Sequence, residues 1–398
     1  MFNLNLSQTL TEIPDPIDNV RRPFLSPIEG EPGNFLLVLD NTSLDHIKRC
    51  HRNAWQYLVL GREAHARNSA LTFGGAIHEG LELFHTWQWT RNHPSHDTAM
   101  IEYSYGKEAQ DRAILNYFSL NPIPPDILAY DHRTPVAALE VMKHYRAQSN
   151  VELHPDYELE ILADDEGPII ERSFEIPMAV LDLSLSLWDL AKILNQETWI
   201  TSATTPKTPV RIHLAWSGRI DLICSINGRP RVLDHKTSSI DTPDYFRGFE
   251  LSSQVRGYVW AAQQLWPDIK PKSFVHNGIF FKKPNKTNSS ASLIARGAKG
   301  GEPPLAFKRT YYPSNVNSEY SDTDLSRWKR DTILLIEDFL HSVSRGVYPM
   351  NDANCVVKYG MCPYHDVCTL ACDNEPAAMK YLMSPAFKPV TWNPTNPR

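Results

Sequence analysis

Two aspartates and a lysine lie close together in the stretch from Trp216 to Ser239, which reads WSGRIDLICSINGRPRVLDHKTSS. Asp221 falls in its first half, and Asp234 and Lys236 fall in its second half. A hard divalent cation prefers carboxylate oxygens as ligands, and a neighbouring ammonium group favours an anionic substrate. The residue types therefore indicate metal-assisted chemistry on an anion.

Two β-strands joined by a tight turn are expected to position these side chains. The strands are predicted over 215–226 and 231–236, because the Asn-Gly pair between them is a strong two-residue hairpin signal. Side chains alternate between the two faces of a strand, so Asp234 and Lys236 share one face. We therefore expect the acid and the lysine to act on the same side of a sheet.

Helical and strand periodicity place the remaining elements around this hairpin. Helices are predicted over 43–60 with Ser43 as the N-cap, over 73–89 beginning at Gly74-Gly75, over 251–266, over 326–344 and through most of 99–148. Strands are predicted within 152–177 and over 273–281. This order of elements predicts a mixed α/β fold, with a small sheet flanked by helices.

Composition limits the classes of function. The chain has 398 residues, of which 42% are hydrophobic and 22% charged, and its formal net charge is -6. Nucleic acid would therefore have to bind a local basic patch rather than a generally cationic surface. No apolar run reaches the roughly 18–20 residues of a membrane helix, and the N-terminus lacks the pattern of a signal peptide. We expect a cytoplasmic protein with no membrane association.

Four motifs together resemble the PD-(D/E)XK nuclease superfamily: Gly74 through His78, GRID over 218–221, LDHKTS over 233–238, and Gln254 with Tyr258. Within it they are most similar to the RecB-like branch, which includes CRISPR-associated exonucleases. Each motif is weak alone, but their order and spacing agree over roughly 42–373. The resemblance implies a restriction-endonuclease-like core with helical insertions and a C-terminal Fe–S segment.

The same resemblance implies a domain organisation. Residues 1–36 would form an N-terminal arm, 37–373 a single nuclease domain, and 374–398 a C-terminal tail. The nuclease domain would include a helical insert at 99–148 and a cysteine segment at 348–373.

The resemblance also assigns roles in a catalytic centre. The catalytic residues would be Asp221, Asp234, Lys236, Gln254 and Tyr258, and the ligands of a Mg²⁺ or Mn²⁺ ion would be His78, Asp221, Asp234 and the backbone carbonyl of His235. Lys236 would orient the attacking water or offset charge at the phosphate. For His78 the alternative is a polar contact between helix and sheet, and for Gln254 and Tyr258 it is simple packing on a helix flank.

Six cysteines stand at positions 50, 224, 355, 362, 368 and 372, four of them within the last fifty residues. Such clustering in a cytoplasmic chain favours metal or cluster ligation over disulfides. The resemblance implies a 4Fe–4S cluster held by Cys50, Cys355, Cys362 and Cys368. Zinc is the alternative, with His365 available to it, and Cys372 could replace Cys355 because the six-residue gap after Cys355 departs from the family pattern. Cys224 is expected to be a small core residue.

A basic stretch at 282–309 is the candidate DNA-binding segment. Its cations include Lys282, Lys283, Lys286, Arg296 and Lys299, followed by Lys308 and Arg309, and Tyr311 and Tyr312 could stack on bases. The alternative is a solvated loop. The chain has no P-loop of the G-x4-G-K-[ST] type, so it cannot drive its own unwinding. Single strands or DNA ends are the expected substrate, and a helicase or recombinase is a candidate partner.

The leading hypothesis is thus a metal-dependent deoxyribonuclease, exonucleolytic on single strands or ends, in recombination, repair or phage DNA processing. A second hypothesis is a non-catalytic DNA-binding or assembly subunit that keeps the fold and a structural Fe–S or zinc site. A third is a zinc-stabilised nuclease that acts on RNA.

Overall fold

The computed structural model describes residues 24–64, 69–93, 98–125, 132–150, 159–238, 245, 248–282, 306–313, 319–357 and 360–390. The chain forms two compact units. Unit 1 contains Met1–Ala66, Ser173–Arg219 and Asp322–Arg398, and unit 2 contains Arg67–Arg172 and Ile220–Ser321. Strands β7 (Ile170–Ser186) and β8 (Pro209–Ile226) contribute residues to both units.

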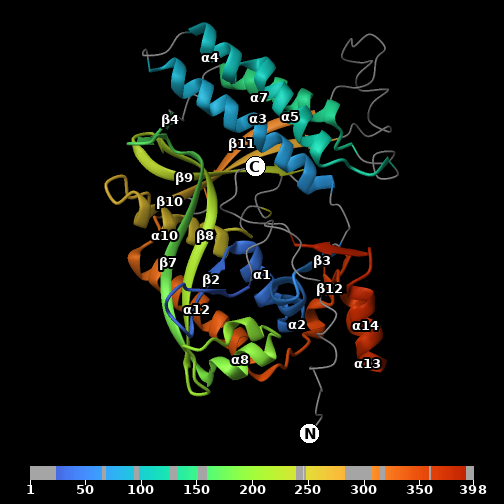
Figure 1. The fold of residues 1–398 in the computed structure, drawn as a ribbon. Helices are drawn as coiled ribbons and strands as arrows, with labels where there is room; N and C mark the ends of the chain where they lie inside the picture. Colours follow the sequence, from blue (N-terminus) through green and yellow to red (C-terminus); the bar gives the residue numbers. More distant parts are fainter. Residues whose placement is uncertain are drawn as a thin grey trace. The chain divides into compact units, whose positions relative to one another are not determined.

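A mixed sheet forms the centre of unit 2 (Figure 1). The second half of β8 is followed by β9 (Arg229–Ser238), β10 (Ser273–Lys282) and β11 (Ala306–Pro313). The β8–β9 and β10–β11 pairs are antiparallel, whereas β9 and β10 are parallel. Strand β4 (Leu159–Ile161) also pairs with β8, and β5 (Ala163–Asp164) with β6 (Gly167–Pro168) makes a small separate hairpin.

The predicted hairpin is confirmed. Asn227 and Gly228 have φ values of 53° and 75°, and Ile226 pairs directly with Arg229. A two-residue turn needs positive φ at both central positions, which asparagine and glycine tolerate better than other residues. The turn therefore fixes the register in which β8 and β9 run side by side.

Helices cover this sheet. The layer over one face consists of α3 (Ser69–Arg91), α4 (Thr98–Tyr105), α5 (Lys107–Leu120) and α7 (Pro135–Asn150), which lie together in Figure 1. Ile77, Ile114 and Tyr145 from these helices pack with Ile279 and Phe281 of β10 in one buried core. Most of the described residues within 99–148 are helical, as the sequence predicted. A further helix, α10 (Ser253–Leu265), is capped by Ser252 and contacts β9 and β10.

The predicted start of α3 is wrong. Gly74-Gly75 do not begin this helix, because it starts at Ser69 and both glycines lie inside it. Gly75 has a role in close packing. A Cβ atom on Gly75 would overlap the hydroxyl and ring of Tyr117 from α5, so glycine at this position leaves room for that side chain as it lies.

Unit 1 surrounds the first half of β8. Strand β2 (Asn34–Leu39) pairs parallel with β8, and β1 (Ser26–Pro27) pairs with β2, so residues 24–36 contribute to the fold. Helix α12 (Asp322–Arg345) packs Trp328 against Trp216 of β8. Helix α8 (Leu187–Ile193) contacts α12 and is followed by a short 3-10 turn at Glu197–Trp199.

The helix predicted over 43–60 is interrupted. Helix α1 (Asn41–Arg49) begins after Asp40, whose carboxylate accepts from the Ser43 N–H, so Asp40 and not Ser43 is the N-cap. Cys50 then adopts an extended backbone (φ -175°, ψ 130°) before α2 (His51–Ala54) and a π-helix (Trp55–Val59). The break turns Cys50 out of helical register.

The C-terminal part contains more structure than the predicted tail. A 3-10 turn (Asp352–Asn354), β12 (Val356–Val357), β13 (Gly360–Met361) and α13 (His365–Asp373) make up the cysteine segment. Helix α14 (Glu375–Leu382) and β14 (Phe387–Pro389) follow, and β14 pairs with β3 (Arg62–Ala64). Within the described residues, no helix has the length and hydrophobicity needed to cross a membrane. The predicted mixed α/β architecture is confirmed and is consistent with a restriction-endonuclease-like fold.

The two adjacent glycines of α3 give a matched test of this packing. We expect Gly75→Ala to lower the free energy of unfolding by about 1–2 kcal/mol, because the overlap with Tyr117 outweighs the better helix propensity of alanine. Gly74→Ala should stabilise by up to about 1 kcal/mol, because its Cβ would lie 3.4 Å from Thr237 Oγ1, an ordinary contact. Urea unfolding of both variants measures the difference, and equal effects would contradict the packing role.

Candidate functional site

Three side chains from three different elements of unit 2 meet at one point. They are His78 of α3, Glu171 of β7 and Asp221 of β8, whose ligand-type atoms all lie within 4.8 Å of one another. His78 Nδ1 is 3.1 Å from Glu171 Oε1 and 3.5 Å from Asp221 Oδ2. The side chains are only 14%, 4% and 7% exposed, respectively. Two carboxylates and an imidazole in this arrangement suit a divalent cation.

Asp234 and Lys236 lie next to this group on β9, as an ion pair. Lys236 Nζ is 3.0 Å from Asp234 Oδ1 and 2.9 Å from Oδ2, so the two side chains share a face, as predicted from strand alternation. Gln254 of α10 donates to the same carboxylate at 3.1 Å, and the His276 ring of β10 lies 3.2 Å from Oδ2. Both oxygens of Asp234 therefore have partners.

The backbone of His235 connects the two groups. Its N–H donates to Asp221 Oδ2 at 2.8 Å, and its carbonyl oxygen lies 3.1 Å from His78 Nε2. The hydrogen-bonded pairing of β8 and β9 ends at Leu222 and Leu233, so the residues beyond can separate and leave these backbone groups available. One residue thus contacts both an acid and the imidazole of the candidate site.

The side chain of His235 points to the opposite face of β9, into the helical layer. It stacks on His85 of α3 with ring centroids 5.1 Å apart. Asn277 Nδ2 lies 2.8 Å from His235 Nδ1 and 2.9 Å from the hydroxyl of Tyr145. Buried polar groups that bond one another restrict a core to one arrangement. This buried network holds His235, and through it the backbone at the candidate site.

The pKa values of Asp221 and Asp234 are shifted in opposite directions by these surroundings. Burial raises the pKa of Asp221 to about 7, with the carboxylates of Glu171 and Asp234 acting in the same direction and His78 opposing. Burial would also raise the pKa of Asp234, but the Lys236 ammonium and His276 hold it well below its usual range. Two neighbouring buried acids with such different proton affinities are typical of a functional site.

The other residues predicted from the sequence lie on α10, at the end of β10 or outside the described residues. Tyr258 lies half-buried on α10, one turn beyond Gln254. Lys282 is the last residue of β10, whereas Lys283, Lys286, Arg296 and Lys299 lie outside the described residues. The predicted loop also ends earlier than expected, because Lys308 and Arg309 belong to β11 and pair with Phe280 and Ile279.

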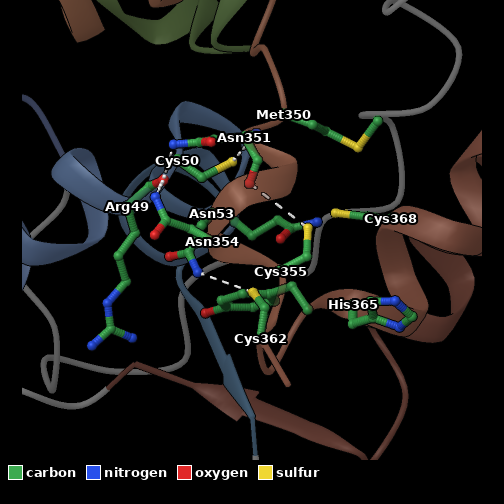
Figure 2. A pocket seen from close by; sticks show the side chains of 12 residues that line it. Arg49, Cys50, Asn53, Met350, Asn351, Asn354, Cys355, Cys362, His365 and Cys368 are labelled. Atoms are coloured by element: carbon green, nitrogen blue, oxygen red, sulfur yellow. Dashed lines mark hydrogen bonds between the residues drawn. The ribbon is translucent and has the colours of Figure 1, made fainter. Parts of the chain in front are cut away.

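A second candidate site lies within unit 1. Cys50, Cys355, Cys362 and Cys368 line one pocket together with residues of α1, α2 and α13 (Figure 2). Cys372 is not among the lining residues. It is exposed, and its thiol donates to the Cys368 carbonyl on the same helix. Cys50 thus meets three cysteines that follow it by about 300 positions in the chain, and Cys355 rather than Cys372 is the third of these.

Hydrogen bonds link the segment around Cys50 to the cysteine segment at this pocket. The side chains of Asn351 and Asn354 donate to the Arg49 carbonyl at the end of α1, at 3.1 and 2.8 Å. Carbonyls at a helix C-terminus lack partners within the helix, so these amides satisfy one of them. The Asn351 N–H points at Cys50 Sγ (3.3 Å), and Asn53 Nδ2 points at Cys362 Sγ (3.4 Å).

The pKa values of two of these thiols are raised by their surroundings. Burial raises the pKa of Cys368 to about 11 and raises that of Cys355, with the neighbouring cysteines acting in the same direction. A bound metal ion would reverse this, because a coordinating thiol is deprotonated. Cys224 is fully buried in the sheet of unit 2, which confirms its expected place in the core.

A sequence profile of the PD-(D/E)XK nuclease superfamily matches residues 41–369. The chain belongs to this superfamily. Its nucleases use divalent metals, and the acidic group at His78, Glu171 and Asp221 fits such an ion in both donor type and spacing. A comparison with curated proteins found no match. Superfamily membership indicates a nuclease, with nucleic acid as the substrate.

Sequence reasoning missed several residues of this PD-(D/E)XK site. Glu171 lies in a predicted strand that also carries Glu175, and nothing in the pattern distinguishes the two. His276 and Asn277 did leave a signal, because they are a polar pair in the middle of an otherwise apolar strand. Fully buried polar side chains are uncommon unless they are bonded, so such a pair indicates a buried network.

The raised pKa of Asp221 predicts a pH dependence of stability in metal-free protein. Between its unfolded value, near 3.8, and about 7, the folded chain holds a proton that the unfolded chain has lost. This carboxyl therefore lowers the free energy of unfolding progressively as pH rises through that window, and adds nothing further above it. We expect Asp221→Asn to become more stable relative to wild type across the window and then to level off.

Urea unfolding in the presence of a chelator, from about pH 4 to about pH 8, measures this effect. Asp268→Asn is the matched control, because Asp268 is exposed beyond the end of α10. A difference between Asp221→Asn and wild type that stays constant over the whole range would contradict the assignment.

Proposed function

We propose that this chain is a Mg²⁺- or Mn²⁺-dependent deoxyribonuclease of the RecB-like branch, exonucleolytic on single strands or ends. The observation that carries this proposal is the meeting of His78, Glu171 and Asp221 beside the Asp234–Lys236 ion pair. Hard oxygen ligands and an ammonium are the two components that phosphodiester hydrolysis needs, one for the metal and one for the phosphate.

The bound ion would supply a water of lowered pKa and a Lewis acid for the phosphate oxygen. The protein groups then have separate tasks. His78 and Asp221 would hold the ion, and the His235 carbonyl, which the resemblance also makes a ligand, lies 3.1 Å from His78 Nε2 and orients its ring. Lys236 presents its ammonium to the attacking water or to the phosphate.

Asp234 fixes where the Lys236 ammonium lies. The pKa of Lys236 would fall on burial, but the carboxylates of Asp234 and Asp221 raise it, so the ammonium stays charged. Gln254 and His276 bond the same carboxylate and restrict its rotation. A preorganised cation at the point where phosphate charge develops contributes to transition-state stabilisation.

The proposed substrate rests on the sequence. The chain lacks a nucleotide-binding P-loop, and its basic stretch at 282–309 can follow a phosphate backbone. DNA single strands or ends fit a nuclease that does not unwind duplexes. A helicase or recombinase would supply such strands, and the process would be recombination, repair or phage DNA processing.

We also propose a 4Fe–4S cluster at Cys50, Cys355, Cys362 and Cys368. The donor set fits, because four thiolates are the usual ligands and N–H groups point at two of the sulfurs. Zinc is the less favoured occupant. A tetrahedral zinc site brings its sulfurs to about 3.8 Å from one another, given Zn–S bonds of about 2.3 Å. Among the described residues, no three of the cysteine sulfurs lie within 4.8 Å of one another.

The nuclease proposal predicts the effect of two substitutions. Asp234→Asn and Lys236→Met should each lower the degradation rate of labelled single-stranded DNA by about 10²–10³-fold, because each removes a charge that positions or stabilises the reacting phosphate. Rates with Mn²⁺ and with Mg²⁺ measure the effect, with Asp268→Asn as the control of unchanged activity. An RNA strand of the same sequence tests the substrate class.

Equal degradation by wild type and both variants would assign the activity to another site. No degradation by any of them would favour the non-catalytic DNA-binding subunit, and faster degradation of the RNA strand would favour the RNA nuclease.

The cluster proposal predicts a coloured protein. Anaerobically purified protein should be brown, with broad absorbance near ~400 nm and bound iron and sulfide. Cys368→Ala should lose the colour, whereas Cys372→Ala should keep it, because Cys372 is exposed and bonds only its own helix among its described contacts. A colourless protein with stoichiometric zinc would contradict the proposal.

A further inference from the structure

We propose that Glu171 is a direct ligand of the catalytic metal and that His78 binds the ion through Nδ1. This inference rests on the proposed function, and it concerns which residues of this chain complete that site. The resemblance assigns Asp221 and Asp234 as the two carboxylate ligands, whereas the structure groups Asp221 with Glu171.

The spacing of the three side chains is compatible with binding one ion, because their ligand atoms all lie within 4.8 Å of one another. Metal–oxygen bonds of about 2.1 Å place neighbouring ligand atoms about 3 Å apart. His78 Nδ1 lies 3.1 Å from Glu171 Oε1 and 3.5 Å from Asp221 Oδ2. Small movements would therefore bring all three atoms to bonding distance of one ion.

The orientation of the His78 ring selects its ligand atom. Nε2 lies 3.1 Å from the His235 carbonyl oxygen, which can only accept a hydrogen bond. Nε2 therefore carries a hydrogen, and Nδ1 is the nitrogen that faces the two carboxylates. A histidine that binds a metal commonly donates its other N–H to a backbone carbonyl, and this ring is arranged in that way.

Asp234 is engaged elsewhere. Its two oxygens bond Lys236, Gln254 and His276, so direct ligation would cost it at least one of these contacts. Glu171 also has an unusual backbone, with φ of 45° in the left-handed region, where most side chains are disfavoured. Its carboxylate is 4% exposed. Strained, buried positions of this kind persist where the surrounding structure fixes them, often at functional sites.

The test measures Mn²⁺ binding without DNA, from the electron paramagnetic resonance signal of free Mn²⁺ during titration. Glu171→Gln should weaken binding at least about tenfold, as expected for loss of a ligand. Glu175→Gln is the matched control, because it makes the same change at an exposed position of the same strand and should leave binding unchanged. Asp221→Asn is the reference for a lost ligand.

A second variant keeps the result interpretable if Glu171→Gln folds poorly. Glycine adopts a φ of 45° without steric strain, so Glu171→Gly should leave the thermal midpoint of metal-free protein unchanged or raise it. The same variant should still weaken Mn²⁺ binding at least about tenfold. A residue with only a structural role would lose thermal stability without losing affinity.

The outcomes distinguish failure of this inference from failure of the proposed metal site. If Glu171→Gln and Glu171→Gly bind Mn²⁺ like Glu175→Gln while Asp221→Asn binds weakly, Glu171 is not a ligand and the proposed nuclease stands. If wild type binds no Mn²⁺, or if Asp221→Asn binds as well as wild type, the proposed metal site fails and this inference fails with it.

Discussion

The hydrogen bond from the His235 N–H to Asp221 is the contact on which the candidate site depends. At 2.8 Å it satisfies one oxygen of an acid that is almost completely buried. A buried carboxylate without such a partner would cost several kcal/mol, at least on transfer scales that allow no compensation. The contact is available because the pairing of β8 with β9 ends at Leu222 and Leu233, before it reaches Asp221 and His235. The same residue then offers its carbonyl to His78, so one backbone unit positions the acid and the imidazole together.

The two candidate sites use the chain in different ways. The acidic site of unit 2 is built from consecutive strands and the helices that cover them, so its geometry follows from strand register and helix packing. The cysteine pocket of unit 1 instead joins residue 50 to residues 355–368, across most of the chain. Its residues are held by short irregular segments and by amide contacts to the end of α1. Bonds from the proposed cluster to all four thiols would add covalent links to a region that is held by short irregular segments.

Sequence patterns predicted those parts of the site that local rules determine. The Asn-Gly turn and the alternation of strand residues placed Asp234 and Lys236 on one face, and the structure agrees. Glu171 was missed because nothing in the strand pattern distinguishes it from Glu175 or reveals its left-handed backbone. Gly75 of α3 was predicted to begin the helix because Tyr117, the residue for which it leaves room, is distant in the sequence. The break at Cys50 was missed for a related reason, since its contacts with the C-terminal segment are remote in sequence.

The formal charges of the acidic site favour a divalent cation, as its geometry does. Glu171, Asp221 and Asp234 carry three negative charges when ionised, and Lys236 carries one positive charge, so with His78 and His276 neutral the group has a net charge of -2. Without a partner the protein must hold protons there, which is the physical content of the raised pKa of Asp221. In the proposed nuclease, a divalent cation would supply the two missing charges and release those protons. The phosphate of a substrate would then meet a site whose acids are neutralised, and the Lys236 ammonium could attract it without opposition from bare carboxylates. Asp234 would contribute by keeping this ammonium at the phosphate.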